Sequence, residues 1–198
     1  MAAATRALII EVSTRLFQQK GYIGVGLNEI LKACQISKGS LYHHFPGGKE
    51  ELLIACLQTL NDAITQDAEA IFARNSGTLE ALEDMIGKLT ADFEAGGTLM
   101  GYTFSSMVSE MASLSDPVRH ACGLLYARLQ DVYARKLEGD GYRAEEAASL
   151  ALLINAAIEG GMLLSLTQRS AEPLKRAAGT LSALLWRERG SGKPRRNP

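Results

Sequence analysis

The sequence predicts an all-α protein, with a small N-terminal three-helix bundle followed by a larger C-terminal helical domain. Three observations predict this fold class. Apolar residues recur at spacings of three and four along most of the 198 residues, which is the period of an amphipathic helix. Only 5 prolines occur, and Pro194 and Pro198 stand at the C-terminal end, so few positions interrupt a helix. No alternating apolar and polar run is bounded by hairpin residues, so no strand is predicted.

The first three helices are short and closely spaced. Gly21 is predicted to end the first helix, whose apolar face comprises Leu8, Ile9, Val12, Leu16 and Phe17. Helices at 27–34 and 38–44 follow, joined by the turn Gln35-Ile36-Ser37. Ser37 is a good N-cap because its hydroxyl can accept a bond from an unpaired backbone N–H. Phe45-Pro46-Gly47-Gly48 ends the third helix.

Longer helices are predicted for the remainder of the chain, with breaks at its glycine and proline clusters. Asp116-Pro117 is a start signal, since a capping residue precedes a proline in the first turn. The predicted helices are 49–74, 78–95, 99–113, 116–138, 144–169 and 171–188. The domains are therefore predicted as 1–48, 49–188 and a disordered basic tail at 189–198.

Charge is distributed unevenly along this chain of net charge -1. Residues 1–50, the basic head, carry six basic and three acidic groups, whereas residues 51–186 carry ten basic and eighteen acidic groups. A hydrophobic content of 46% and a charged content of 22% are typical of a globular protein with a core. A basic end on an acidic body favours contact with phosphate, and an accident of composition is the alternative.

Cysteine usage and the N-terminus predict a cytoplasmic protein. Cys34, Cys56 and Cys122 are odd in number and widely spaced, which favours buried, reduced thiols. The first residues lack the pattern of a signal peptide. The stretch 147–166 is about as long as the ~20 residues of a membrane span, but Asn155, Glu159 and two glycines interrupt it. We therefore expect a helix buried between its own domain and a partner subunit, and no membrane.

Two short helices after a stabilising first helix predict a helix-turn-helix, whose second helix fits the major groove of DNA. Leu41 and Phe45 lie four residues apart and can face a core with Leu16, Phe17 and Ile30. The exposed or flanking positions are then Lys38, Gly39, Ser40, Tyr42, His43 and His44. Lys49, at the start of the next helix, adds charge where helix amides can also bind phosphate. Taken singly, Lys38 and Lys49 could be ordinary solvated lysines.

Four segments together resemble the DNA-binding domain of the TetR family. They are Gly21-Tyr22, Leu27-Asn28-Glu29-Ile30, Ile36-Ser37-Lys38-Gly39-Ser40-Leu41-Tyr42-His43-His44-Phe45 and Lys49-Glu50-Glu51-Leu52-Leu53. The variant Phe45-Pro46-Gly47-Gly48-Lys49-Glu50 resembles the LmrA/YxaF-like branch. The resemblance covers about a quarter of the chain. It implies a dimer that binds a near-palindromic operator, usually as a repressor released by a ligand, and it adds Leu27 and Asn28 to the DNA-facing set.

This sequence departs from the family pattern at two positions. Gly26 stands where the family often has Thr or Ser, so a capping hydroxyl and its phosphate contact are lost. Gln35 stands where the family often has Gly, at a turn position that can require a left-handed backbone, which Gln tolerates less well.

Neither a metal, a cofactor nor an enzymatic activity is predicted. His43 and His44 are adjacent, point apart on a helix and have no third ligand near them in the sequence. No acid–base pair, nucleophile motif or phosphate-binding loop is recognisable, and Glu110 and Glu159 are isolated acids.

A ligand pocket is predicted among aromatic and methionine residues of the larger domain, because such pockets are mostly apolar. The candidates are Phe93, Tyr102, Phe104, Met107, Met111, Tyr126 and Leu129, together with Leu125 and Tyr133. A plain hydrophobic core is the alternative for most of them. Asn155 and Glu159 lie four apart on an apolar helix and serve either a ligand or a structural hydrogen bond.

Small and apolar residues near the C-terminus predict a homodimer with a four-helix interface. Gly160 and Gly161 permit close helix approach, and they are joined by Leu164, Leu181, Leu184 and Leu185. The function predicted is a cytoplasmic repressor that binds double-stranded operator DNA and is released by a small, hydrophobic or drug-like inducer. The alternative is a DNA-binding architectural or regulatory protein of the same fold that has no small-molecule ligand.

Overall fold

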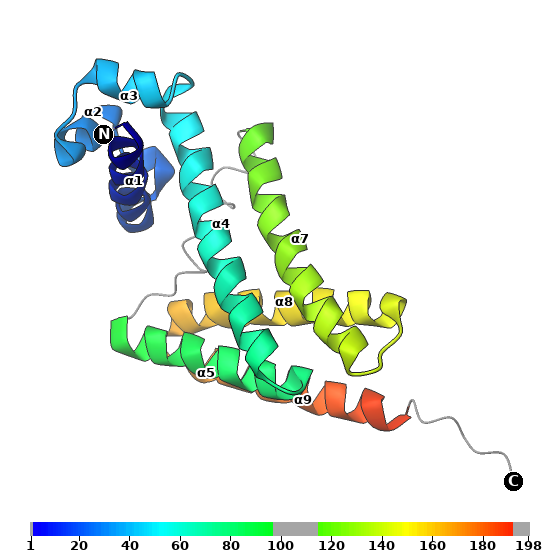
Figure 1. The fold of residues 1–198 in the computed structure, drawn as a ribbon. Helices are drawn as coiled ribbons and strands as arrows, with labels where there is room; N and C mark the ends of the chain where they lie inside the picture. The colour runs from blue at the N-terminus through cyan, green and yellow to red at the C-terminus, as the bar shows by residue number, and fades with distance from the viewer. Residues whose placement is uncertain (1, 97–114, 192–198) are drawn as a thin grey trace, which may run out of the picture. The chain divides into compact units, whose positions relative to one another are not determined.

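The computed structural model describes residues 2–96 and 115–191, and every regular element in these ranges is a helix (Figure 1). The N-terminal helices are α1 (Ala2–Gly24), α2 (Leu27–Cys34) and α3 (Lys38–His44). The longer helices are α4 (Gly48–Arg74), α5 (Thr78–Gly96), α7 (Asp116–Gly139), α8 (Ala144–Gln168) and α9 (Glu172–Ser191). The predicted all-α fold class is therefore confirmed.

The predicted helix boundaries agree with the structure within a few residues, with two exceptions. The end predicted at Gly21 is a kink, where the backbone takes φ 72° and ψ 167° before a last short stretch to Gly24. Helix α9 continues to Ser191 and so extends into the segment predicted as a disordered tail. The helix predicted at 99–113 and residues 192–198 lie outside the described residues.

The described residues form two compact units. Unit 1 holds 2–64 and 115–125, and unit 2 holds 65–96 and 126–191. Helix α4 is 27 residues long, about 40 Å. Its first part belongs to unit 1 and its second part to unit 2.

Unit 1 has its own hydrophobic core, which joins α1, α2 and α3 to the beginning of α4. The Cys56 thiol of α4 donates to the carbonyl of Ile10 on α1 across 3.6 Å. Ser115, just before α7, donates to Glu50 at the start of α4 across 2.7 Å. The side chains that fill the core are Ile9, Phe17, Val25, Ile30, Leu41, Phe45, Leu52 and Leu53.

In unit 2, α9 packs against both α8 and α5. A close approach occurs at Gly161 on α8, where a Cβ atom would lie 2.9 Å from the side chain of Leu174 and 3.1 Å from its Cα. The core contains Leu82, Met85, Leu129, Tyr133, Leu137, Ile154, Leu174 and Leu185.

The turn between α4 and α5 is held by polar contacts rather than by apolar packing. Arg74 and Asn75 both donate to the carboxylate of Asp84, at 2.7 to 2.9 Å. The bond from Asn75, and after it those from Arg74, hold the pKa of Asp84 below its ordinary value. The ammonium of Lys136 on α7 donates to the carbonyl of Asn75. The predicted break at Asn75-Ser76-Gly77 is therefore an ordered turn.

Candidate DNA-binding interface

The turn between α2 and α3 is closed by a left-handed residue. Gln35 has φ 55° and ψ 42°, which confirms that this position requires a left-handed backbone. Its N–H bonds the carbonyl of Lys32, and the next N–H, of Ile36, bonds the carbonyl of Leu31. These bonds satisfy carbonyls at the end of α2, so that the chain reverses within three residues.

Ser37 caps the start of α3, as predicted. The Ser37 hydroxyl accepts a hydrogen bond from the backbone N–H of Ser40 at 3.1 Å. Leu41 and Phe45 are fully buried, so α3 is fixed to the core of unit 1 by one face, as their spacing predicts. Leu16, which the same reasoning places in this core, is only half-buried.

The opposite face of α3 is open. Lys38, Gly39, Tyr42 and His43 are exposed, whereas Ser40 and His44 are half-buried. The Lys38 ammonium lies 5.9 Å from the centre of the Tyr42 ring, so a cation and a phenol occupy the same region of α3. The rings of His43 and His44 meet edge to face at 5.1 Å.

Metal binding has no support within the described residues, where no three His, Cys, Asp or Glu side chains gather closely enough to hold an ion.

The start of α2 lacks a side-chain cap. Gly26 is the N-cap residue, with an extended backbone of φ -82° and ψ 151°, and no side-chain hydrogen bond closes the first turn. Leu27 is half-buried and Asn28 is exposed. The amides of this helix start therefore remain accessible beside an exposed carboxamide.

Lys49 has a different environment from the one expected of a phosphate contact. Its ammonium donates to the backbone carbonyl of Tyr22 and lies 3.9 Å from the centre of the Tyr22 ring. The Lys49 side chain is half-buried, unlike that of Lys38. Sequence reasoning missed this contact because 27 residues separate the two partners.

Some of the basic residues in the basic head form ion pairs with acidic residues of the same segment. Lys20 is paired with Glu29, and Arg15 lies 3.5 Å from Glu11. Lys32 is exposed and has no side-chain partner within the part of the chain that the structure describes. Sequence reasoning missed Lys32 as a DNA candidate, although it stands one helical turn after Asn28 and so on the same side of α2.

The three cysteines are free and buried, as predicted. Burial raises the pKa of Cys56 to about 12 and that of Cys122 to about 11. Burial also raises the pKa of Cys34. All three thiols are therefore neutral near pH 7, and the thiolate is the reactive form.

The predicted ligand-binding residues are brought together only in part. Phe93 and Leu129 are buried, Tyr126 is half-buried, and Tyr102, Phe104, Met107 and Met111 lie outside the described residues. Asn155 is buried and Glu159 is half-buried on α8. Burial, and secondarily the charge of Glu159, raise the pKa of Tyr133 on α7. The Tyr133 hydroxyl contacts the sulfur of Met85 at 3.8 Å.

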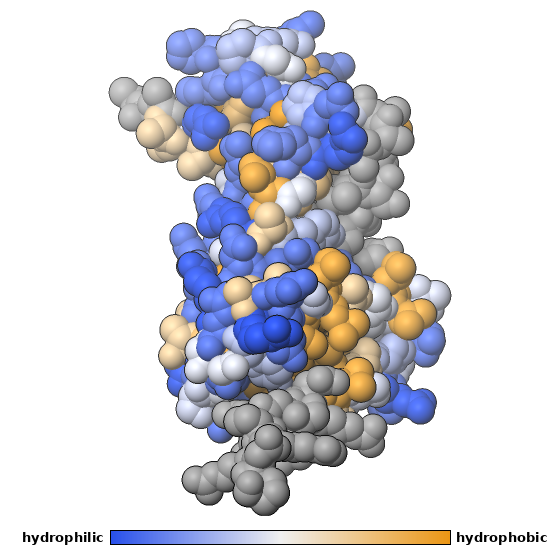
Figure 2. Space-filling view, turned by 90° about the vertical axis from the view of Figure 1, so that its right-hand side faces the viewer, coloured by the Kyte–Doolittle hydropathy of each residue, from blue (hydrophilic) through white to orange (hydrophobic). Residues whose placement is uncertain are grey.

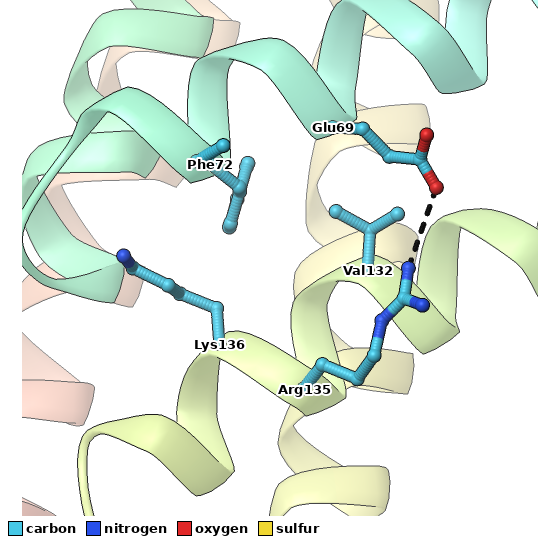
Figure 3. A pocket seen from close by; sticks show the side chains of 6 residues that line it. Glu69, Phe72, Val132, Arg135 and Lys136 are labelled. Atoms are coloured by element: carbon cyan, nitrogen blue, oxygen red, sulfur yellow. Dashed lines mark hydrogen bonds and ion pairs between the residues drawn. The ribbon is translucent and has the colours of Figure 1, made fainter.

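Two cavities of unit 2 are lined by described residues. Figure 3 shows the first, a groove of about 370 Å³ where α4 and α7 present Phe72 and Val132 beside an ion pair between Glu69 and Arg135. The second, of about 650 Å³, is lined by Phe93, Glu94, Leu166, Arg169, Ser170 and Ala171. Of the predicted ligand-binding set, Phe93 alone lines one of these two cavities.

Helices α8 and α9 leave apolar side chains exposed. Leu164 on α8 is 51% exposed and Leu184 on α9 is 44% exposed, whereas Leu181 and Leu185 are buried at 4% and 2%. Gly160 has open space, whereas Gly161 packs on Leu174. Of the six residues predicted for a dimer interface, three are therefore at the surface and three in the core of their own chain. Sequence reasoning missed the exposed side chains of Leu152, Leu153 and Leu163.

In Figure 2, hydrophobic residues form a patch on one face of the molecule, and hydrophilic residues surround it. Of the helices searched in the described ranges, α8 alone is long and apolar enough to cross a membrane. Its buried side packs on α9, so length and composition alone do not make it a span.

Sequence comparisons give two family matches. Residues 9–56 match the bacterial regulatory proteins of the tetR family, and residues 78–180 match the C-terminal domain of LmrA/YxaF-like transcriptional regulators. The chain is 37% identical over 181 residues to the uncharacterized HTH-type transcriptional regulator YxaF of Bacillus subtilis, covering 91% of this chain and 95% of YxaF. It is 35% identical over 183 residues to the HTH-type transcriptional regulator LmrA of the same organism, covering 92% of this chain and 97% of LmrA.

Solved structures share the fold. The reduced form of E. coli NemR has a TM-score of 0.77 at 24% identity, covering 90% of this chain and 95% of NemR. A TetR-family regulator from Cytophaga hutchinsonii has a TM-score of 0.81 at 19% identity, covering 93% of this chain and 94% of that one.

Proposed function

Because the chain belongs to the TetR family and has an LmrA/YxaF-like C-terminal domain, it is a DNA-binding transcriptional regulator and not an enzyme, and we propose that it is a ligand-responsive repressor. In this proposal a cytoplasmic homodimer binds a near-palindromic operator. A small hydrophobic or drug-like molecule releases it.

The main support for the proposal is that α3 has one buried apolar side and one exposed polar side. Buried Leu41 and Phe45 hold this helix by one face, and Lys38 and Tyr42 stand exposed on another. Side chains at the start of such a helix reach base edges in the major groove, while hydroxyl and ammonium groups contact phosphates. We assign DNA contacts to Lys38, Gly39, Ser40, Tyr42, His43 and His44 of α3, with Leu27, Asn28 and Lys32 of α2.

A homodimer is supported by the exposed leucines of α8 and α9. Exposed apolar surface of this kind is costly in water and typical of a subunit interface. We assign the interface to Leu152, Leu153, Gly160, Leu163, Leu164 and Leu184. A two-fold dimer presents two recognition helices about 34–36 Å apart, which is one turn of DNA.

Ligand control is supported by polar side chains that the larger unit buries. Tyr133 on α7 is 2% exposed and Asn155 on α8 is 7% exposed, and both lie among apolar core residues. An apolar site with few polar groups is typical of small-molecule pockets. The ligand must favour a dimer conformation that no longer matches the operator.

The first experiment identifies the DNA. Purified protein is mixed with fragmented genomic DNA, bound fragments are sequenced, and a common palindromic sequence is expected. Absence of any shared sequence would contradict operator recognition. A K38A variant is expected to change the preferred base at one position in each half-site, whereas a mere loss of affinity would remove the base-reading role of Lys38.

The second experiment tests the dimer by light scattering after size exclusion. L164D places a charge on the exposed α8 face and is expected to give monomers that bind the operator weakly. L124D is the matched control, because Leu124 on α7 is 48% exposed and lies outside the proposed interface. A dimeric L164D protein would refute this interface.

The alternative is a regulator of the same fold without a ligand. Thermal-shift screening of hydrophobic compounds, followed by operator titration, separates the two. A compound that raises the melting temperature and weakens operator binding supports the repressor, and an operator affinity that no bound compound changes favours the alternative.

A further inference from the structure

Lys49 is the second residue of α4, and its side chain is half-buried. The ammonium donates to the Tyr22 carbonyl and lies 3.9 Å from the centre of the Tyr22 ring. One cation is therefore held by a backbone acceptor and an aromatic face at once. Both interactions stabilise a charged amine that is half-buried.

Tyr22 is itself fixed in place. Its ring centroid lies 5.6 Å from that of Phe17, a side chain that is 1% exposed in the core of unit 1. The kink at Gly21 turns the chain so that the Tyr22 carbonyl is available to a side chain outside α1. Burial first, and then the charge of Glu50, raise the pKa of Tyr22, so its ring remains a neutral phenol. Lys49 is thus bonded to a residue that packs against the core of unit 1.

The residue before Lys49 supports the recognition helix. Gly48 begins α4 with φ +69°, a conformation that favours glycine. A Cβ at Gly48 would lie 3.4 Å from Cε1 and 3.7 Å from the hydroxyl oxygen of Tyr42. The exposed ring of Tyr42 therefore rests against the backbone at the start of α4, and the position of that backbone decides where the ring points.

These contacts form one chain from the core to the DNA-facing surface: Phe17, Tyr22, Lys49, Gly48 and Tyr42. We propose that Lys49 is a positioning residue for operator binding, which acts through Tyr22 to hold the start of α4 under Tyr42, and is not a phosphate ligand. The inference rests on the proposed operator binding and concerns how its surface is assembled.

The salt dependence of operator binding tests it. Each phosphate contact contributes roughly 0.9 to the slope of log affinity against log salt concentration. K49M keeps the length of the side chain and removes the charge, and it is expected to weaken binding about tenfold, the low end for losing a hydrogen bond to a charged group. The slope should stay at the wild-type value. K32M is the matched control, because Lys32 is exposed on α2 and is assigned a DNA contact without a base-reading role, and its slope should fall by about 0.9 per subunit.

A double-mutant cycle tests the route through Tyr22. Y22L keeps the backbone carbonyl and removes the ring. If Lys49 acts through this contact, K49M costs less affinity in the Y22L background than in wild type. K49R, which keeps the charge and the donors, should restore most of the affinity. Additive losses in the cycle would overturn the proposal.

The outcomes separate this inference from the proposed function. A K49M slope that falls with that of K32M would make Lys49 a phosphate ligand and overturn the inference alone. Unchanged affinity of folded K49M, with only a lower melting temperature, would also overturn it, because a merely structural role moves stability and not affinity. Failure of wild type to bind any captured fragment would overturn operator binding and this inference with it.

Discussion

The carboxylate of Asp140 accepts a hydrogen bond from the backbone N–H of Thr78 at 2.7 Å. Asp140 lies in the turn after α7, and Thr78 is the first residue of α5. An amide at a helix N-terminus has no partner within its helix, so a residue 62 positions away provides the cap. The α7–α8 turn thereby fixes the start of α5.

Replacing Asp140 is therefore expected to destabilise unit 2. D140A removes the acceptor and should lower the free energy of unfolding by about 1–2 kcal/mol, whereas D140N keeps an oxygen and should retain most of the stability. Urea denaturation at a fixed protein concentration measures both. D131A, at an exposed position of α7, is the control and should stay within about 0.5 kcal/mol of wild type. A D140A midpoint equal to that of D131A would show that the cap contributes nothing.

Replacing Gln35 by glycine is expected to stabilise unit 1. Gln35 has φ 55°, where a side chain is strained and glycine is not. Q35G should raise the free energy of unfolding by roughly 0.5–1 kcal/mol after the greater flexibility of unfolded glycine is allowed for. The matched variant Q35A keeps a Cβ in the same conformation and should gain nothing. Equal stabilities of Q35G and Q35A in thermal unfolding would contradict the strain.

A cap at Gly26 is expected to strengthen α2. The extended backbone of Gly26 suits any residue, and a Cβ there would meet nothing within 4 Å. G26S supplies the missing acceptor and should be about 1 kcal/mol more stable than G26A, which adds the Cβ alone. Chemical denaturation of the two variants measures this difference directly. If G26A is as stable as G26S, the first turn of α2 does not need a cap.

The native thiols are expected to resist alkylation. Cys34, Cys56 and Cys122 are buried, and burial raises the pKa of each. At pH 8 a maleimide or iodoacetamide should modify none of them in the folded protein and all three in denaturant. Mass spectrometry counts the adducts. A single rapidly labelled cysteine in the native protein would show that its site opens on the timescale of the reaction.

Local signals in the sequence predicted most of the fold. Ser37 as a cap, the left-handed conformation of Gln35 and the missing cap at Gly26 each depend on a few neighbouring residues, and all three agree with the structure. The spacing of Leu41 and Phe45 likewise identified the buried face of α3.

Contacts between distant residues could not be predicted from the same signals. Lys49 and Tyr22, or Asp140 and Thr78, meet only after the helices have packed. Periodicity placed Leu181, Leu184 and Leu185 on one apolar face. It does not tell which of these side chains pack in the core of their own chain and which stay exposed for a partner subunit. The structure buries Leu181 and Leu185 and exposes Leu184.

The contact between Gly161 and Leu174 limits how the body can deform. A side chain at this crossing would collide with the backbone of Leu174 as well as with its side chain, so that any residue larger than glycine must push α8 and α9 apart. Since both helices carry exposed leucines, we expect such a change to alter the spacing of the leucine-bearing surface as well as the core beneath it.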